Sequence, residues 1–485
     1  NNTIGPISGT SAGPRGIVVT SGVANAAISI SGNTVTGLST TSTGTATGIA
    51  LSGATAGVDI SGNSVSNIKN TNTTGYGSNG IWLASTSTAA NTRVFNNFIW
   101  DVASNGYTLS AGVADNGYGM VVSAGAGYAI TYNTVLLNTN QTADGLPSAL
   151  NVTSGVTAAG ALDVRNNILA TTQSNGTDRY AIYSGAANTV FSSINNNDYW
   201  SAGPNLGYIS SNRAALADIQ TGFGGNTNSK SVAPTFVSAV SPINLHLSNA
   251  LGDNLCLNGT ATPIAWITTD IDGDTRNVTT PDMGADEFNP TLPTFVVSNQ
   301  SACFGNTVDL TAAGVTAGSA VGQTFTYFTD AACTNAVATP AAVGAGTYYI
   351  KATYTSGGCS IDQISSVVVT INALPTVSLT VTETSGSTAN DGTICAGDAA
   401  TLTASGAVSY TWAPGGATTA AITESPATTT SYTVTGTDAN GCQNTATTTI
   451  TVNALPTASI AIAETSGTTN NDGTICVGAS VSLTA

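Results

Sequence analysis

The sequence predicts an all-β protein in which a parallel β-helix is followed by antiparallel β-sandwich modules. Three observations lead to this prediction. A short phrase built around asparagine recurs about every 30 residues, which is the signature of a solenoid. Apolar and polar residues alternate beside each copy, as they do in β-strands. Two later segments, which start at Asn372 and Asn453, are near-copies of each other.

The asparagine phrase, first seen complete as Ile30-Ser-Gly-Asn33-Thr-Val35, defines the repeat. Its asparagines are Asn2, Asn33, Asn63, Asn97, Asn133, Asn167 and Asn197, separated by 31, 30, 34, 36, 34 and 30 residues. An alternating strand precedes each asparagine, and a second family with the pattern Gly-Ile-x-Leu lies between them. Two strands in each turn leave no room for helices, so we expect a parallel β-helix with apolar residues in its bore. The asparagines should lie at a corner, where Asn tolerates a left-handed backbone and its amide can bond to the next coil.

After Trp200 the repeat loosens. Residues 211–220 are expected to form one short helix, with Ser211 or Asn212 as its N-cap. Short strands are expected at 234–237 and 243–247. Two acidic segments follow, Asp270-Ile-Asp-Gly-Asp274-Thr-Arg276 and Pro281-Asp-Met-Gly-Ala-Asp-Glu-Phe288.

The asparagine coils and this closing DxDGDxR…PDxGAxEF motif together resemble the secreted right-handed parallel β-helix proteins of the pectin-lyase-like superfamily. More narrowly, they resemble the large repeat-bearing surface proteins that bacteria export through the type IX secretion system. The resemblance covers residues 1–289, which we treat as one domain. It implies a location outside the cell or on the bacterial surface.

From residue 290 the sequence changes to Thr-rich alternating strands with closely spaced turn residues, the pattern of antiparallel sandwiches. We expect a first module at 290–372, a second module at 373–453 and the start of a third at 454–485. The modules resemble Ig-like or PKD-like bacterial surface repeats, and Trp412 should lie in a core. On this resemblance we expect the disulfides Cys395–Cys442 and Cys303–Cys359, with Cys256 and Cys333 unassigned and Cys476 paired outside this sequence.

Composition narrows the class of protein. The net charge of −16 argues against a nucleic-acid partner, and it is compatible with calcium binding and an extracellular surface. The seven cysteines show no metal-binding spacing, and disulfides in an exported protein are the natural interpretation. No apolar run is long enough for a membrane helix. Because the sequence starts and stops inside repeats, we expect it to be part of a longer protein.

No group of residues stands out as a catalytic centre. The outward positions of the strands before the asparagines form a column, Ser29, Asp59, Arg93, Ala129, Asp163 and Ser193. Asp59 and Arg93 are expected to form an ion pair. Asp59 and Asp163 are three coils, or about 14 Å, apart, whereas the carboxylates of glycosidases lie about 5–9.5 Å apart. The weak catalytic candidates that remain are Asp163 and Arg165, the latter as a base.

Two further groups could bind ligands. Asp270, Asp272 and Asp274 could supply oxygens to calcium, but the favoured interpretation is a closing turn in which these aspartates bond to backbone amides and to Arg276. His246, the only histidine, is expected at the surface.

Trp82, Asn151 and Tyr183 lie on the outward column of the Gly-Ile-x-Leu strands and could form a platform for sugar rings. The alternative is that a loop covers Trp82.

Together these features favour an extracellular, adhesin-like surface protein whose β-helix binds a polysaccharide or a cell-surface glycan, with the modules as a stalk. The enzymatic alternative, weighed as the less favoured one, is a polysaccharide lyase or hydrolase acting on the flank of the β-helix. A passive spacer or filament subunit is the structural alternative. No cofactor other than calcium is indicated.

Overall fold

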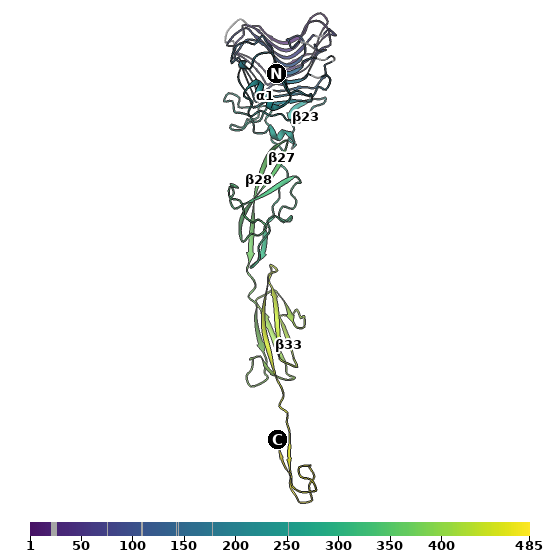
Figure 1. The fold of residues 1–485 in the computed structure, drawn as a ribbon, viewed down its shortest axis with the longest axis vertical. Coiled ribbons are helices and arrows are strands. Elements are labelled where there is room, and N and C mark those ends of the chain that lie inside the picture. The colour runs from purple at the N-terminus through teal and green to yellow at the C-terminus, as the bar shows by residue number, and fades with distance from the viewer. Residues whose placement is uncertain are drawn as a thin grey trace. The chain divides into compact units, whose positions relative to one another are not determined.

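The computed structural model describes residues 1–20, 27–74, 76–107, 110–141, 143, 145–176, 178–250 and 252–485. The chain forms two compact units, which are described separately. The first unit consists of residues 1–294, 320–324 and 352–363. The second unit consists of residues 295–319, 325–351 and 364–485. Figure 1 shows the path of the chain and labels its principal elements.

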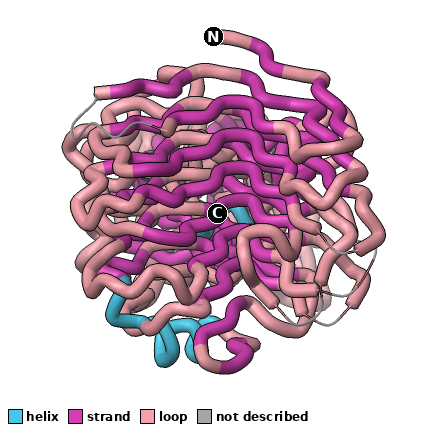
Figure 2. The backbone as a smooth tube through the Cα atoms, turned by 90° about the horizontal axis from the view of Figure 1, so that it is seen from above, coloured by secondary structure: helices cyan, strands magenta, loops and turns pink. Residues whose placement is uncertain are grey.

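Residues 1–213 form a parallel β-solenoid of about six turns, in agreement with the predicted β-helix. Figure 2 shows its strands stacked coil upon coil. Its described strands form three sheets. Sheet I contains β4 (Ile28–Ser31), β7 (Val58–Ser61), β10 (Thr92–Phe95), β13 (Tyr128–Thr131), β16 (Leu162–Arg165) and β19 (Phe191–Asn195). Sheet II contains β1 (Thr3–Ile4), β2 (Ile7–Gly9), β5 (Thr34–Thr40), β8 (Ser64–Asn70), β11 (Phe98–Ala103), β14 (Thr134–Leu137), β17 (Ile168–Thr171) and β20 (Asp198–Ser201). Sheet III contains β3 (Arg15–Val19), β6 (Ala46–Gly53), β9 (Ser78–Ser85), β12 (Gly117–Ala124), β15 (Ser148–Val152), β18 (Tyr180–Ser184), β21 (Gly207–Ile209) and the antiparallel β22 (Ser211–Arg213).

The bore of the solenoid is filled by the inward apolar residues of all three sheets. In a single coil Ile60 of sheet I, Val65 of sheet II and Ile81 of sheet III are all fully buried. In the first four strands of the Gly-Ile-x-Leu family the glycine is required by this close stacking, whereas β15 and β18 have alanine at the position. A Cβ at Gly80 would lie 2.4 Å from the carbonyl oxygen of Gly119, which leaves no space for a side chain.

The sequence predicted two strands in each turn, but the structure has three. The strand that follows each asparagine was not recognised because its later copies lack alternation. All four residues of β14 and of β17 are buried, since a segment from later in the chain covers the outer face of sheet II. A period-two pattern requires one solvated face, and these strands have none.

Residues 214–294 close the solenoid. The helix α1 (Leu216–Phe223) buries Ile219 and Phe223 against the last coil. It begins later than predicted, and Ser211 and Asn212 belong to strand β22 rather than to an N-cap. Short strands β23 (Phe236–Ser238) and β24 (Asn244–Leu247) pair antiparallel, close to their predicted positions. The 3-10 turns are η1 (Asn188–Val190) and η2 (Asp253–Cys256).

Residues 257–288, called the closing segment below, pack along sheet II. Leu257, Met283 and Ala285 are fully buried there, in one core with Leu136 and Ile168. The segment therefore supplies the second apolar face that the later strands of sheet II require.

The two modules that follow are built from short sheets around small cores. The first contains one sheet with the order β25 (Gln300–Cys303), β28 (Cys359–Asn372), β27 (Gly346–Ser356) and β26 (Gln323–Phe328). The second contains β29 (Ser378–Thr382), β31 (Ala400–Ser405) and β33 (Ala421–Glu424) in one antiparallel sheet, and β30 (Thr393–Cys395), β35 (Gln443–Asn453), β34 (Thr430–Thr437) and β32 (Ser409–Ala413) in another. Strands β36 (Ala461–Ala463) and β37 (Ser482–Thr484) form a hairpin. Trp412 is buried in the core of the second module, as predicted.

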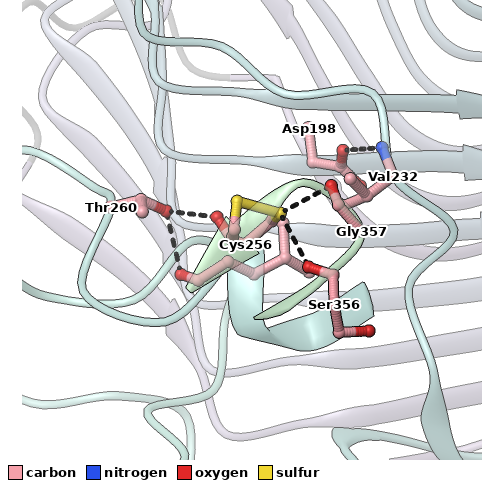
Figure 3. Close-up of a disulfide and its surroundings, with 8 residues drawn as sticks. Asp198, Val232, Cys256, Thr260, Ser356 and Gly357 are labelled. Carbon is pink, nitrogen blue, oxygen red and sulfur yellow. Dashed lines mark hydrogen bonds between the residues drawn. A yellow bond between two sulfur atoms is a disulfide. The ribbon is translucent and has the colours of Figure 1, made fainter. Parts of the chain in front are cut away.

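The disulfides differ from the predicted ones. Cys256 is bonded to Cys359 (Figure 3) and Cys303 to Cys442, while Cys395 and Cys476 are free thiols. The predicted pairs were wrong because their members lie at opposite ends of a module. Cys303 is in register with Asn372, and Cys359 begins the same 14-residue strand β28, so about 44 Å separates them at 3.4 Å per residue.

Candidate functional site

The asparagines form a ladder at the corner between sheets I and II, and its members from Asn33 to Asn197 are buried. The side-chain amide Nδ2 of each donates to the Oδ1 of the equivalent asparagine in the next coil, at 2.9–3.1 Å from Asn2 to Asn197. The same Oδ1 atoms also accept the backbone N–H of the preceding asparagine, as in Asn133 N to Asn167 Oδ1 at 3.0 Å. The ladder is thus structural, because the amide groups of its asparagines are engaged in hydrogen bonds to one another.

The left-handed corner residue is the one before each ladder asparagine, not the asparagine itself. In the first coils this residue is glycine, with φ of 65° at Gly32. In later coils it is Asn96, Tyr132, Asn166 or Asn196, which carry side chains that hold the closing segment. Asn166 Nδ2 donates to the carbonyl of Thr262 at 2.8 Å, and Tyr132 Oη donates to the same carbonyl at 2.7 Å.

The aspartates of the closing segment mostly organise its backbone. Asp270 Oδ1 accepts the N–H groups of Asp272 and Asp274 at 3.0 and 2.9 Å, and its Oδ2 accepts that of Glu287. Arg276, 3% exposed, donates to Glu287 Oε2 at 3.1 Å and lies over the ring of Tyr132. This is the arrangement of a closing turn. Asp270, Asp272 and Asp274 do not together form a group of described side chains whose ligand atoms gather within 4.8 Å of one another.

A different group has the proximity required for a cation. Among the described residues, a ligand atom from each of His246, Asp272 and Asp286 lies within 4.8 Å of the others. His246 Nε2 is 2.6 Å from Asp272 Oδ2, and its Nδ1 contacts Asn244 Oδ1. At 2.6 Å this contact is a hydrogen bond, which an N–H of the imidazole donates to the carboxylate. His246 is half-buried and in contact with Phe98.

The outward column of sheet I has the predicted register. Ser29, Asp59, Arg93, Ala129, Asp163 and Ser193 are aligned as neighbours on successive strands. Arg93 forms a two-pronged ion pair with Asp59, as predicted, with 2.6 Å between Nε and Oδ1. Asp163 is paired in the same way with Arg165, at 2.6 Å for both contacts.

This pairing bears on the catalytic candidates. The hydrogen bonds that Arg165 donates to the Asp163 carboxylate raise the pKa of Arg165 above its ordinary value, so the guanidinium stays protonated and is unsuited to act as a base. The carboxylate of Asp163 is engaged by the same contact.

A groove follows this column, and we call it the flank groove. It consists of two adjoining hollows of about 460 and 320 Å³ that share Asn91 and Arg93. The first is bordered by Ser29 and Asp59, and the second by Asp163 and Trp266. Trp266 of the closing segment is 41% exposed.

Trp266 is held in place by two contacts. The guanidinium carbon of Arg93 lies 4.6 Å from the ring centroid, and Phe95 contacts the ring edge-on at 5.1 Å. The groove thereby combines a fixed aromatic surface with guanidinium donors and carboxylate acceptors, which are the groups that bind sugar rings and hydroxyls. Sequence analysis did not identify Trp266, because it lies in an irregular segment 173 residues after Arg93.

The predicted platform of Trp82, Asn151 and Tyr183 on sheet III is not one continuous surface. Trp82 is half-buried, donates from Nε1 to Ser123 Oγ at 2.8 Å and lies near Arg15. Asn151 is fully buried and donates to the carbonyl of Ala111 at 2.8 Å, so it does not face solvent. The loop containing Ala111 therefore covers the middle of the platform rather than Trp82. Tyr183 lies beyond it, stacked on Tyr208 at 4.5 Å.

Comparisons of the sequence with protein-family models and with curated proteins found no match to either. Within the part of the chain that the structure describes, no helix has the length and hydrophobicity needed to cross a bilayer.

Proposed function

We propose that this chain belongs to an extracellular, adhesin-like surface protein and that its solenoid binds a polysaccharide or cell-surface glycan along the flank groove. The observation that carries the proposal is the position of Trp266, an exposed ring held beside Arg93 in a groove lined by paired charges. Stacking on the ring would orient a sugar, and the ion pairs would exchange hydrogen bonds with its hydroxyl groups.

The charges favour a neutral glycan. Each described charge that lines the groove is paired, as Asp59 is with Arg93 and Asp163 is with Arg165. The whole chain carries a charge of −16, which opposes the approach of a polyanion. The disulfides support an oxidising, extracellular location. On the resemblance described above, we assign the solenoid to the right-handed pectin-lyase-like class exported by type IX secretion and the modules to Ig-like or PKD-like spacers.

The test is binding of the full chain to an array of neutral and acidic glycans, followed by calorimetry with the best ligand. We expect Trp266→Ala to weaken binding about tenfold, since aromatic stacking contributes about 0.5–1.5 kcal/mol and 1.4 kcal/mol is a factor of ten. The matched control is Trp82→Ala on sheet III, which should bind as the unaltered chain does. Equal losses from both substitutions, or the release of new reducing or unsaturated sugar ends, would contradict a binding role for the groove.

A further inference from the structure

The first and second modules each carry an early and a late cysteine at equivalent positions, and residues 454–485 carry a further early cysteine. The early cysteines are followed by a glycine two residues later, in Cys303-Phe-Gly305, Cys395-Ala-Gly397 and Cys476-Val-Gly478, with φ of 92°, 99° and 89° at these glycines. The late cysteines, Cys359 and Cys442, directly follow Gly358 and Gly441, each with φ of 82°. The shared backbone conformation shows that these positions correspond between modules.

The early and late cysteines lie at opposite ends of their module. Cys395 is in register with Asn453, the last residue of β35, whereas Cys442 directly precedes the first residue of that strand. A strand of 11 residues spans about 34 Å at 3.4 Å per residue, while a disulfide joins Cα atoms no more than about 7 Å apart. A disulfide between the early and the late cysteine of the same module is therefore excluded by distance in both modules.

The observed disulfides instead join successive parts of the chain. Cys303, the early cysteine of the first module, is bonded to Cys442, the late cysteine of the second. Cys256, just before the closing segment, is bonded to Cys359, the late cysteine of the first module. In both cases a late cysteine is bonded to a cysteine in the part of the chain that precedes its module.

We propose that Cys395, as the early cysteine of its module, forms a disulfide of the same kind. Its partner is the late cysteine of a module of this kind placed directly after residue 453. Cys395 is a half-buried free thiol at the position that Cys303 occupies in the first module. The bond forms by exchange with a disulfide oxidant such as oxidised glutathione. One thiolate attacks the oxidant and releases one thiol, and the second thiolate displaces the other. Two protein thiols and one glutathione disulfide give one protein disulfide and two glutathione thiols.

The test is a chain in which a second copy of residues 373–453, with serine in place of its own early cysteine so that the chain contains a single Cys395, is inserted after residue 453. After refolding with oxidised glutathione, free thiols are alkylated and the non-reduced digest is analysed by mass spectrometry. We expect a cross-linked peptide that contains Cys395 and the copied Cys442, with Cys303–Cys442 retained. Cys395→Ser in the same chain should leave the copied late cysteine open to alkylation. Complete alkylation of Cys395 in the duplicated chain would overturn the proposal.

A second arm uses the unaltered chain length, so that the result does not depend on folding of the inserted copy. In Cys303→Ser we expect both Cys442 and Cys395 to be alkylated, because they are too far apart to pair. A Cys395–Cys442 cross-link in this variant would show that the two cysteines can meet within one module, and would overturn the proposal independently.

Discussion

At the scale of single residues, the ladder asparagines carry an unusual number of hydrogen bonds. Asn133 is fully buried, and its Nδ2 donates to Asn167 Oδ1 and to the carbonyl of Val94. Its Oδ1 accepts both the backbone N–H and the Nδ2 of Asn97. No smaller side chain can satisfy these groups, so each ladder position demands asparagine for the sake of its neighbours.

We therefore expect Asn133→Ala to lower the free energy of unfolding by at least about 2 kcal/mol, because an unsatisfied buried polar group costs about 1–3 kcal/mol. Denaturant unfolding followed by circular dichroism measures this. The control is the exposed Asn188, whose replacement by alanine should change stability by no more than about 0.5 kcal/mol. Equal effects of the two substitutions would mean that the ladder contributes no more than a surface amide.

The spacing of the asparagines was sufficient to predict the ladder, because a polar residue that recurs once in each coil must meet its own copies. It was not sufficient to place the left-handed residue. Gly32 and Asn166 both occupy that position, in different coils, and both have a left-handed backbone. Their residue types differ because the side chain of Asn166 also bonds to the closing segment. Trp266 escaped prediction for the same reason, since only the folded chain brings it to Arg93.

At the scale of elements, the closing segment depends on buried carboxyl groups. Asp282 is 2% exposed, and its oxygens accept the N–H groups of Gly259 and Phe288 at 2.5 and 2.8 Å. Burial raises the pKa of Asp282 to about 7 and that of Asp286 to about 6. Both shifts have the same sign, so the folded segment binds protons more readily than the unfolded chain.

We expect stability to fall as the pH rises from about 5 to 8. Below a pH of about 4 the carboxyl of Asp282 is protonated in both states, and between that pH and its folded pKa of about 7 the folded state holds the extra proton. Stability then decreases with pH, because it falls wherever the folded state binds more protons. Melting temperatures of the full chain at pH 5.5 and 8 measure the effect.

The matched variant for this measurement is Asp282→Asn, which removes the titrating group and keeps the shape of the side chain. Its melting temperature should differ less between the two pH values than that of the unaltered chain, even if it is lower at both. The same difference in the variant would assign the pH dependence to other groups.

The elements themselves were predictable to different degrees. The strands of sheets I and III and their register were confirmed. Those of sheet I alternate in the sequence because their outward side chains, such as Asp59 and Asp163, are partly exposed. Sheet II was missed, because the closing segment buries residues such as Ile168 and Ala170 on its outer face. The helix begins later than predicted, because residues 211–213 form the antiparallel strand β22. A capping pattern in the sequence does not reveal such a strand.

At the scale of the whole molecule, the disulfides tie together parts of the chain that are far apart in sequence. Cys256 and Cys359 are 103 residues apart, and closing a loop of that length by a disulfide stabilises the folded state by about 4–5 kcal/mol in the chain-entropy model. Near this bond Asp198 Oδ1 accepts the N–H of Val232, and Thr260 donates to the carbonyl of Cys256 (Figure 3). Residues 352–363, which include the turn between β27 and β28, belong to the same compact unit as Cys256.

We expect Cys256→Ala/Cys359→Ala to release this hairpin tip without unfolding the solenoid, whose core does not include it. Amide hydrogen exchange should become at least tenfold faster within residues 352–363 and should stay unchanged along the ladder. The matched control is Cys303→Ala/Cys442→Ala, which removes the other disulfide and should leave exchange in 352–363 as it is. If both variants accelerated exchange there equally, the hairpin would be held by the modules as a whole. If neither did, the contacts around Cys256 would suffice without the covalent bond.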